Sequence, residues 1–341
     1  MRMHSISAGD GRTTPVRFTA LVPKALAATL FAASAACLAQ AGAYPAKPVK
    51  LVVGFAAGGP TDVVARAFAD HASRALGQPF IIDNKPGANT ILAAQAVASA
   101  PADGYTLLFG ATNHTMIPGL YSGRVKFDAV KSFKPLCTVA TSPTVLVVGQ
   151  GLPVKTLADY MARARQEPGR VTAGTAGVGS SGHFATEMFA RANGLKLNHV
   201  PYKGAAPVVT DLMGGQLGSS FATLGSVQPQ IRSGKLAALA VASPRRSSLL
   251  PDVPTFAEAG GGNYSADAWY GVLAPAGLPE PIAQQLEKVA REFAGSASAA
   301  ERLRGLGLDA DSTCGTAFAA LVEREVATYT QIARDLDLKA E

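Results

Sequence analysis

The stretch VKLVVGFAAGGPTDVVARAFADHASRAL, from Val49 to Leu76, decides the fold class. Its first seven residues, through Phe55, form a nearly continuous apolar run, which is typical of a strand buried on both faces of a parallel sheet. A glycine-rich turn follows, and from Val63 onward the apolar residues recur at helical spacing until Gly77, a C-cap residue. A buried strand, a tight turn and an amphipathic helix together predict the first unit of an α/β fold.

Two more strands with a helix between them follow along the chain. The apolar runs PFIIDN (79–84) and YTLLFG (105–110) predict strands, and the small-residue segment 90–100 predicts a helix. Residues 101–104, PADG, supply the turn before the third strand. Strands and helices in this alternating order imply right-handed crossovers and a parallel sheet.

A second α/β series begins after two strand-like stretches at 136–139 and 144–148. A last strand at 269–273 then precedes two amphipathic helices. Two series joined by strand-like crossings predict two lobes with a ligand cleft between them, hinged near residues 140–145 and 240–245. Within the second series we predict helices over 157–166, 181–192, 207–213 and 226–232, and strands over 171–175, 197–202, 217–221 and 236–242.

The N-terminus has the three parts of a secretory signal peptide. Residues 1–24 carry four basic side chains and one acidic one, residues 25–38 form an uncharged apolar run, and Ala39-Gln40-Ala41 is a small-x-small cleavage pattern. The apolar run is shorter than the roughly 20 residues that a membrane-spanning helix needs. We therefore expect export, with cleavage near Ala41. Lipidation at Cys37 is the alternative, although the residues before it lack the leucine expected of a lipoprotein signal.

Composition excludes several classes of protein. The exported part would keep 300 of the 341 residues and a formal charge of about +4, which is too thinly spread for nucleic-acid binding. A hydrophobic content of 48% excludes a disordered chain. Two cysteines, Cys137 and Cys314, would remain, too few for a disulfide scaffold. They could pair in an oxidising compartment, and the sequence leaves this open.

The loop Gly58-Gly59-Pro60-Thr61-Asp62 leads directly into a helix. Free backbone N–H groups and the positive end of the helix dipole make such a place suitable for an anion. An equally good interpretation is a tight turn in which Thr61 or Asp62 caps the helix. Loops after other predicted strands are also rich in glycine and hydroxyl groups. Together they suit a small carboxylated or polar molecule that is held mainly by main-chain N–H groups.

Catalytic and cofactor motifs are poor. GFAAGGPT (54–61) departs from the phosphate-binding P-loop because Pro60 stands where the lysine is required, and no G-x-G-x-x-G pattern is present. The sequence GSSG (179–182) is not the G-x-S-x-G of a nucleophile elbow. The histidines are not spaced with cysteines or carboxylates as metal ligands would be. We predict no enzyme activity, no cofactor and no metal.

Eight segments together resemble the substrate-binding proteins of tripartite tricarboxylate transporters, the Bug family. The resemblance covers nearly all of the chain after residue 41, and the segments occur in the family's order. They are YPAKPVKLVVGFAAGGPTDVVAR (44–66), LGQPFIIDNKPGAN (76–89), PADGYTLLFG (101–110), GTAGVGSSGH (174–183), VPYKGAAPVVTDLMGGQ (200–216), SGKLAALAVASPRR (233–246), DVPTFAEAG (252–260) and WYGVLAPAGLP (269–279).

The resemblance implies a periplasmic binding protein with a two-lobed α/β fold of the Venus-flytrap, type II-like kind. After a signal peptide over 1–41, residues 42–143 and 241–341 would form lobe 1 and residues 144–240 lobe 2. The chain would be a monomer without cofactor, and it would close on a small organic acid and deliver it to a membrane permease. Two alternatives stay open: a ligand-sensing domain for a signalling partner, and an exported enzyme on the same fold.

The resemblance also implies which residues bind the ligand. The family pattern places the backbone that grips a carboxylate in the first loop and an opposing set in the loop after residue 174, with further candidates in neighbouring loops. In this sequence the first loop gives Gly58, Gly59, Thr61 and Asp62, the opposing loop gives Thr175, Gly179, Ser180 and Ser181, and the neighbouring positions are Thr112, Asn113, Tyr202, Lys203 and Thr223.

Three positions depart from the family pattern. Ala176 stands where members often have proline, and Gly218 stands where many have an acid. Ala222 stands where many have an aspartate after the phenylalanine. Because an acid there could pair with an ammonium group, its absence favours a plain carboxylate over an amino acid as ligand.

Overall fold

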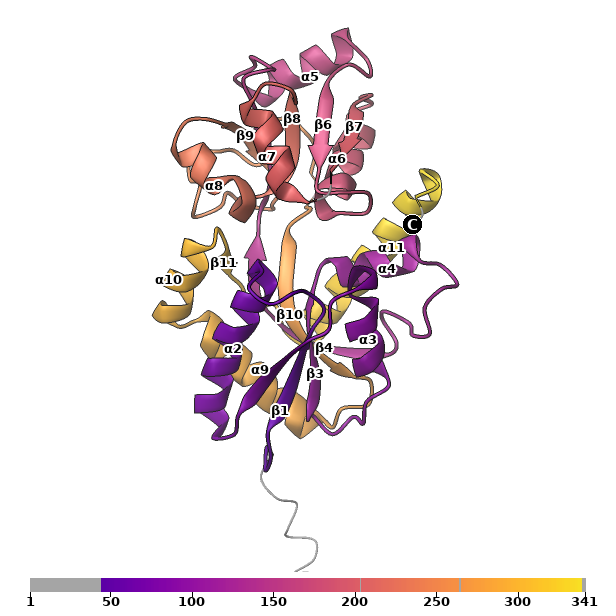
Figure 1. The fold of residues 1–341 in the computed structure, drawn as a ribbon, viewed down its shortest axis with the longest axis vertical. Helices are drawn as coiled ribbons and strands as arrows, with labels where there is room; N and C mark the ends of the chain where they lie inside the picture. Colours follow the sequence, from indigo (N-terminus) through magenta and orange to yellow (C-terminus); the bar gives the residue numbers. More distant parts are fainter. Residues whose placement is uncertain (1–43, 203, 264, 339–341) are drawn as a thin grey trace, which may run out of the picture. The chain divides into compact units, whose positions relative to one another are not determined.

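The computed structural model describes residues 44–338 except 203 and 264 (Figure 1). The predicted signal peptide and its cleavage site at Ala41 lie outside the described residues. Among the described residues, no helix combines the length and the apolar character that crossing a membrane requires.

The first sheet, sheet A, has six strands in the order β11-β4-β10-β3-β1-β2. The first three strands along the chain pair in parallel, as predicted, whereas β10 runs antiparallel to both β3 and β4. The sheet is therefore mixed, because β10 enters it from the second lobe and not through a strand–helix–strand crossover. The strands are β1 (Val49–Val53), β2 (Phe80–Asn84), β3 (Thr106–Ala111), β4 (Phe133–Ser142), β10 (Ala268–Pro275) and β11 (Asp309–Ala310).

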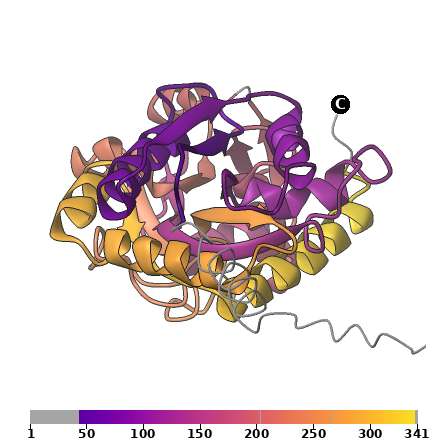
Figure 2. The same ribbon diagram turned by 90° about the horizontal axis from the view of Figure 1, so that it is seen from below.

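Helices cover both faces of sheet A, which explains the continuous apolar run in β1. Leu51 belongs to a buried cluster with α2 and α9, while its neighbour Val52 packs in a separate cluster with α3 and α11. Successive strand residues point to opposite faces, so each face needs its own apolar set. Figure 2 shows α9 and α11 running along β4. These helices are α2 (Pro60–Leu76), α3 (Ile91–Ala98), α9 (Glu280–Ala294), α10 (Ala297–Gly305) and α11 (Thr316–Asp335).

The second sheet, sheet B, has five strands in the order β7-β6-β8-β5-β9. Strand β6 pairs in parallel with β7 and β8, and β5 is antiparallel to β8 and β9. Because β6, β7 and β8 point the same way, their carboxyl ends meet at one edge. The strands are β5 (Thr144–Val148), β6 (Thr172–Thr175), β7 (Asn198–Pro201), β8 (Ser219–Thr223) and β9 (Ala237–Val241), and the helices are α5 (Leu157–Gln166), α6 (Ser181–Ala192), α7 (Ala205–Met213) and α8 (Leu224–Arg232).

Each sheet has its own helices and its own buried core, so the predicted two-lobed α/β fold is confirmed. In sheet B, Leu146 packs with Phe189 of α6, and Val145 packs with Leu212 of α7 on the other face. We call sheet A with its helices lobe 1 and sheet B with its helices lobe 2. The resemblance implies that residues 241–341 belong to lobe 1. In the structure, Phe256 from this range packs in the core of lobe 2.

Two crossings connect the lobes, and they are hydrogen-bonded to each other. Pro143 alone separates β4 from β5, whereas residues 242–267 separate β9 from β10. The Thr144 hydroxyl donates to the carbonyl oxygen of Ala266 over 2.6 Å, and the Ala242 amide donates to the Thr144 carbonyl oxygen over 2.7 Å. The crossings therefore form one joint.

Two helices are present where the sequence predicts none. Helix α4 (Asn113–Leu120) follows β3 directly, and its first residues read as a polar loop in the sequence. His114, in its first turn, is fully buried and bonded to the Ala129 carbonyl oxygen. The short length of α4 and the presence of Pro118 hide the helical pattern, and burial overrides the weak local preference. Helix α10 begins at the N-cap Ser296 and was also missed.

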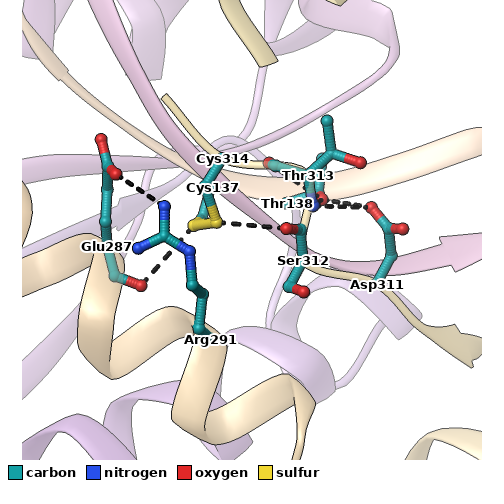
Figure 3. The surroundings of a disulfide bond; sticks show 8 residues. All are labelled: Cys137, Thr138, Glu287, Arg291, Asp311, Ser312, Thr313 and Cys314. Carbon is teal, nitrogen blue, oxygen red and sulfur yellow. Dashed lines mark hydrogen bonds and ion pairs between the residues drawn. A yellow bond between two sulfur atoms is a disulfide. The ribbon is translucent and has the colours of Figure 1, made fainter. Parts of the chain in front are cut away.

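The structure answers the question that the two cysteines left open. Cys137 of β4 and Cys314, just before α11, form a disulfide across 177 residues of chain (Figure 3). Beside it, the Thr138 hydroxyl contacts the Asp311 carboxylate, and the Thr313 amide donates to the Thr138 hydroxyl over 2.8 Å. The segment before α11 is thereby joined to β4 by covalent and hydrogen bonds.

Candidate ligand-binding site

The loop after β1 is held in shape by the carboxylate of Asp62. This carboxylate accepts hydrogen bonds from the Gly58 amide (2.8 Å), from the Arg66 guanidinium (2.8 Å) and from the Asn84 amide (2.9 Å). Burial alone would raise the pKa of Asp62, but the hydrogen bonds from Arg66, Gly58 and Asn84 outweigh it and lower the pKa. The Asp62 carboxylate is thus satisfied internally and orders the loop.

Helix α2 starts at this loop with an end suited to an anion. Gly59 is the N-cap and Pro60 the first helical residue, so the amides of Thr61 and Asp62 lie in the first turn without partners in their own helix. Gly58 has φ +84°, which a glycine adopts without strain. Four predicted residues, Gly58, Gly59, Thr61 and Asp62, therefore shape one helix end, and Thr61 and Asp62 supply the N–H groups.

A strained turn lies next to this loop, and the sequence did not assign it to the binding site. Ala88, Asn89 and Thr90 all have positive φ, from 45° to 71°, a costly conformation that clusters at functional sites. The Asn113 side-chain amide donates to Oδ1 of Asn89 and to Oγ1 of Thr90, both over 3.2 Å. A Cβ at Gly54 would lie 2.5 Å from Thr90, so only glycine allows this approach. The only local indication of this turn in the sequence was the segment KPGAN (85–89).

Thr112, another predicted residue, is occupied by a contact with β10. Its hydroxyl accepts from the Trp269 amide (2.7 Å) and its amide donates to the Trp269 carbonyl oxygen (3.2 Å). The Trp269 indole and the Thr115 hydroxyl both donate to the carboxyl group of Glu325, over 2.8 and 3.0 Å. Burial raises the pKa of Glu325 to about 7. Thr112 thus anchors the start of α4 to β10.

In lobe 2, Thr175 at the end of β6 is bonded on two sides. Its hydroxyl lies 2.7 Å from Nε2 of His199, and its carbonyl oxygen accepts from the Tyr202 amide over 3.0 Å. The Tyr202 hydroxyl donates to Asp211 over 2.7 Å, and burial together with this bond raises the pKa of Tyr202 to about 12. Lys203, a further predicted residue, lies outside the described residues.

Gly179 connects the loop after β6 to a pair of histidines. Its amide donates to Nδ1 of His183 over 3.1 Å, so that nitrogen is the acceptor and Nε2 carries the proton in the neutral ring. The His183 ring stacks on His199 with centroids 3.8 Å apart. Burial, and then the neighbouring His199, lower the pKa of His183 to about 3. A Cβ at Gly179 would lie 2.5 Å from Leu120, so this loop of lobe 2 meets α4 of lobe 1.

A pocket of about 50 Å³ opens at the edge of sheet B where β6 and β8 end. The N-terminal ends of α6, α7 and α8 surround it, and none of the described residues that line it carries a charge. Three predicted residues, Ser180, Ser181 and Thr223, are brought together here, while Ser220, Ser226 and Gly182 were not identified from the sequence. Of these three, Gly182 could have been identified from the sequence, because it belongs to the segment GSSG (179–182).

The end of α6 gives this pocket its chemistry. The Ser180 hydroxyl caps the helix by accepting from the His183 amide over 3.3 Å, and the amides of Ser181 and Gly182 lie in the first turn. A Cβ at Gly182 would lie 2.2 Å from the Phe221 carbonyl oxygen, so glycine is needed for the helix end to meet β8. Unpartnered first-turn amides and the positive end of the helix dipole favour an anionic group.

Within residues 44–338, leaving aside 203 and 264, no three histidine, cysteine, aspartate or glutamate side chains gather as metal ligands would. The described residues that line the pocket offer backbone N–H donors, hydroxyl groups and apolar side chains.

Residues 64–338 match the family model described as tripartite tricarboxylate transporter family receptor, TctC. The chain belongs to this family. Among curated proteins, it is 35% identical over 281 residues to the protein BugT of Bordetella pertussis, covering 82% of this chain and 86% of BugT. The resemblance inferred from the eight sequence segments is thereby confirmed.

Solved structures of similar proteins agree with this assignment. The R. palustris protein Rpa4515, determined with adipate, is 35% identical with a TM-score of 0.72, and the match covers 85% of this TctC-family chain and 97% of that one. MatC from Rhodopseudomonas palustris, determined with bound malate, is 30% identical with a TM-score of 0.69, and the match covers 85% and 100%. Adipate and malate are both dicarboxylates.

Proposed function

We propose that this chain is the periplasmic receptor of a tripartite tricarboxylate transport system and that it binds a small organic acid. The single observation that carries the proposal is the pocket at the N-terminal end of α6, which Ser181 and Gly182 of the first turn line together with other described residues that carry no charge. The similarity of this chain to proteins determined with adipate and with malate supports a carboxylate as the anion.

Closure of the two lobes on the ligand is the mechanism we propose. The end of α2 in lobe 1 and the end of α6 in lobe 2 would each hold one end of the acid, and the joint at Thr144, Ala242 and Ala266 would act as the hinge. A ligand that touches both lobes favours the closed state by its higher affinity for that state. The closed receptor would then deliver its ligand to the membrane permease.

Removal of one amide at the end of α6 tests this site. Proline is tolerated at the first position of a helix and lacks an N–H, and Ser180 before it already has the extended conformation that proline requires. We expect Ser181→Pro to weaken binding of succinate, glutarate or adipate by about tenfold, since a hydrogen bond to a charged group contributes roughly 1.5 kcal/mol. Isothermal titration calorimetry on residues 42–341 measures this directly.

Two control variants isolate the backbone N–H. Ser181→Ala keeps the amide and removes only the hydroxyl, and Ala297→Pro makes the same change at the first position of α10 in lobe 1. We expect both to bind nearly as tightly as the unaltered chain.

Small-angle scattering with and without the bound acid tests closure through a decrease in the radius of gyration. If none of these acids binds, the proposed function is refuted.

A further inference from the structure

The two lobes touch each other through the backbones of two glycines. Gly225 is the second residue of α8 in lobe 2, and Gly307 lies in lobe 1, in the loop between α10 and β11. A Cβ at Gly307 would lie 2.5 Å from the Cα of Gly225, and a Cβ at Gly225 would lie 2.5 Å from the Leu306 carbonyl oxygen. Real Cβ atoms essentially never come within 3.0 Å of such atoms, so the lobes meet this closely because neither glycine has a side chain.

This glycine contact lies at the edge of the pocket and not inside it. Gly225 stands between Thr223 and Ser226, which both line the pocket, but is not itself among the described lining residues. Gly179, which precedes the pocket-lining serines of α6, makes the other close approach, because a Cβ there would lie 2.5 Å from the Leu120 side chain of α4. Lobe 1 therefore meets lobe 2 at two places next to residues that line the pocket.

The loop of lobe 1 that contains Gly307 is held at both of its ends. Gly307 has φ +72°, and its amide donates to the Arg304 carbonyl oxygen over 3.1 Å at the end of α10. Two residues later, the Asp309 carboxylate accepts from the hydroxyl groups of Ser247 (2.9 Å) and Ser248 (2.5 Å), which belong to the segment that connects the lobes. Because the loop is fixed in this way, a side chain added at the contact should separate the lobes and not deform the loop.

We infer that Gly225 and Gly307 are positioning residues for closure, because their contact sets how near the two lobes come around the bound acid. This inference rests on the proposed function and names residues that control its closing movement. The contact is close to the joint, since the amide of Leu224, next to Gly225, donates to the carbonyl oxygen of Pro143 over 2.8 Å. A small added volume beside a hinge moves the far ends of the lobes by a larger distance, so the ends of α2 and α6 would no longer reach the same acid.

The variant Gly225→Ala adds one methyl group at the contact. Gly225 is not one of the glycines with positive φ, and alanine favours a helix over glycine, so the change does not disturb the folding of lobe 2. We expect succinate, glutarate and adipate to bind at least about tenfold more weakly in titration calorimetry, because forcing a methyl group into a packed contact costs at least this much affinity. The melting temperature of the protein without acid should stay the same or rise, since the lobes can then separate.

Gly305→Ala is the matched control. Gly305 is the last residue of α10, two residues before Gly307, and a Cβ there would have no other atom within 4 Å. We expect Gly305→Ala to bind the three acids as tightly as the unaltered chain. In small-angle scattering with saturating acid, the radius of gyration of Gly225→Ala should stay larger than that of Gly305→Ala, which a change in stability alone would not produce.

Hydrogen exchange on the unaltered chain gives a second measurement that needs no variant. Residues 305–309 are not among the described lining of the pocket, so slower exchange there when acid is added reports contact between the lobes. Unchanged exchange at 305–309, equal affinities of Gly225→Ala and the unaltered chain, or equal weakening by Gly305→Ala would each overturn the inference. If the unaltered chain binds none of the three acids, the proposed function itself is refuted.

Discussion

His183 and His199 lie face to face, with their ring centroids 3.8 Å apart and their planes within 7° of parallel. Each ring holds a part of the loop that enters the candidate site. Nδ1 of His183 accepts from the Gly179 amide, and Nε2 of His199 lies against the Thr175 hydroxyl. Two stacked rings cannot both become charged without repulsion, so the pair favours the neutral form.

Acid is expected to destabilise the protein through this pair. The folded state lowers the pKa of His183 to about 3, whereas an unfolded histidine has a pKa of about 6.5. The unfolded chain therefore binds more protons between these values, so the stability from neutral His183 is complete above about pH 6.5 and is lost as the pH falls. We expect the melting temperature to decrease from about pH 7 to about pH 4.

The variant His183→Asn separates titration from hydrogen bonding. The Asn oxygen can still accept from the Gly179 amide but does not titrate, so the melting temperature should depend less on pH over this range. His183→Ala loses the acceptor as well and should be less stable at every pH. A pH dependence in His183→Asn as steep as in the unaltered chain would exclude His183 as the cause.

Glu325 is expected to act in the opposite direction at higher pH. Burial raises the pKa of Glu325 to about 7, so the folded state holds a proton that the unfolded state has lost. The stability that protonated Glu325 gives the folded state is complete below about pH 4 and is lost as the pH rises through about 7. Glu325→Gln imitates the protonated acid, accepting from the Trp269 indole and the Thr115 hydroxyl. Its melting temperature should fall less between about pH 6 and pH 8.

Glu323→Gln serves as the control for this measurement. Glu323 lies two residues earlier on α11 and is exposed, so its replacement should leave the pH profile of the melting temperature unchanged. Identical profiles for the two variants would mean that Glu325 does not titrate in this range.

The disulfide between Cys137 and Cys314 is expected to contribute strongly to stability. It closes a loop of 177 residues that includes the whole of sheet B, and a cross-link over so long a loop restricts the unfolded chain. Replacing both cysteines with serine should lower the free energy of unfolding by about 2–5 kcal/mol. Chemical denaturation measures the change. A reductant should reproduce it in the unaltered chain and have no effect on the double variant.

Two serine caps allow stability and binding to be distinguished. Ser180 caps α6 and Ser296 caps α10, with hydrogen bonds of 3.3 and 3.2 Å to the amide three residues later. Replacement of either serine by alanine should lower stability by about 1 kcal/mol. Only Ser180→Ala should also weaken binding of the carboxylate, because the pocket lies at the N-terminal end of α6 and not at that of α10. Equal binding by both variants would place the ligand elsewhere.

Much of the fold could be predicted because its signals are local. The run from Val49 to Leu76 contains a strand, a turn and a helix whose periods are visible in the residues, and the structure has β1 and α2 there. Helix α4 could not be predicted in this way. It is short and begins with polar residues, and its place is determined by burial of Met116 and Leu120 against Phe184 and Tyr329, which are distant in sequence.

The sequence by itself determined the family, the alternating α/β order and the loops that face the candidate site, because apolar periodicity and glycine-rich turns are properties of neighbouring residues. Only the tertiary structure decided which groups in those loops are already engaged. Asp62 binds Arg66 and Asn84, Gly179 binds His183, and Cys137 is joined to Cys314. Most of these partners come from other elements, and a hydrogen bond or a disulfide forms only when folding brings the two groups within bonding distance.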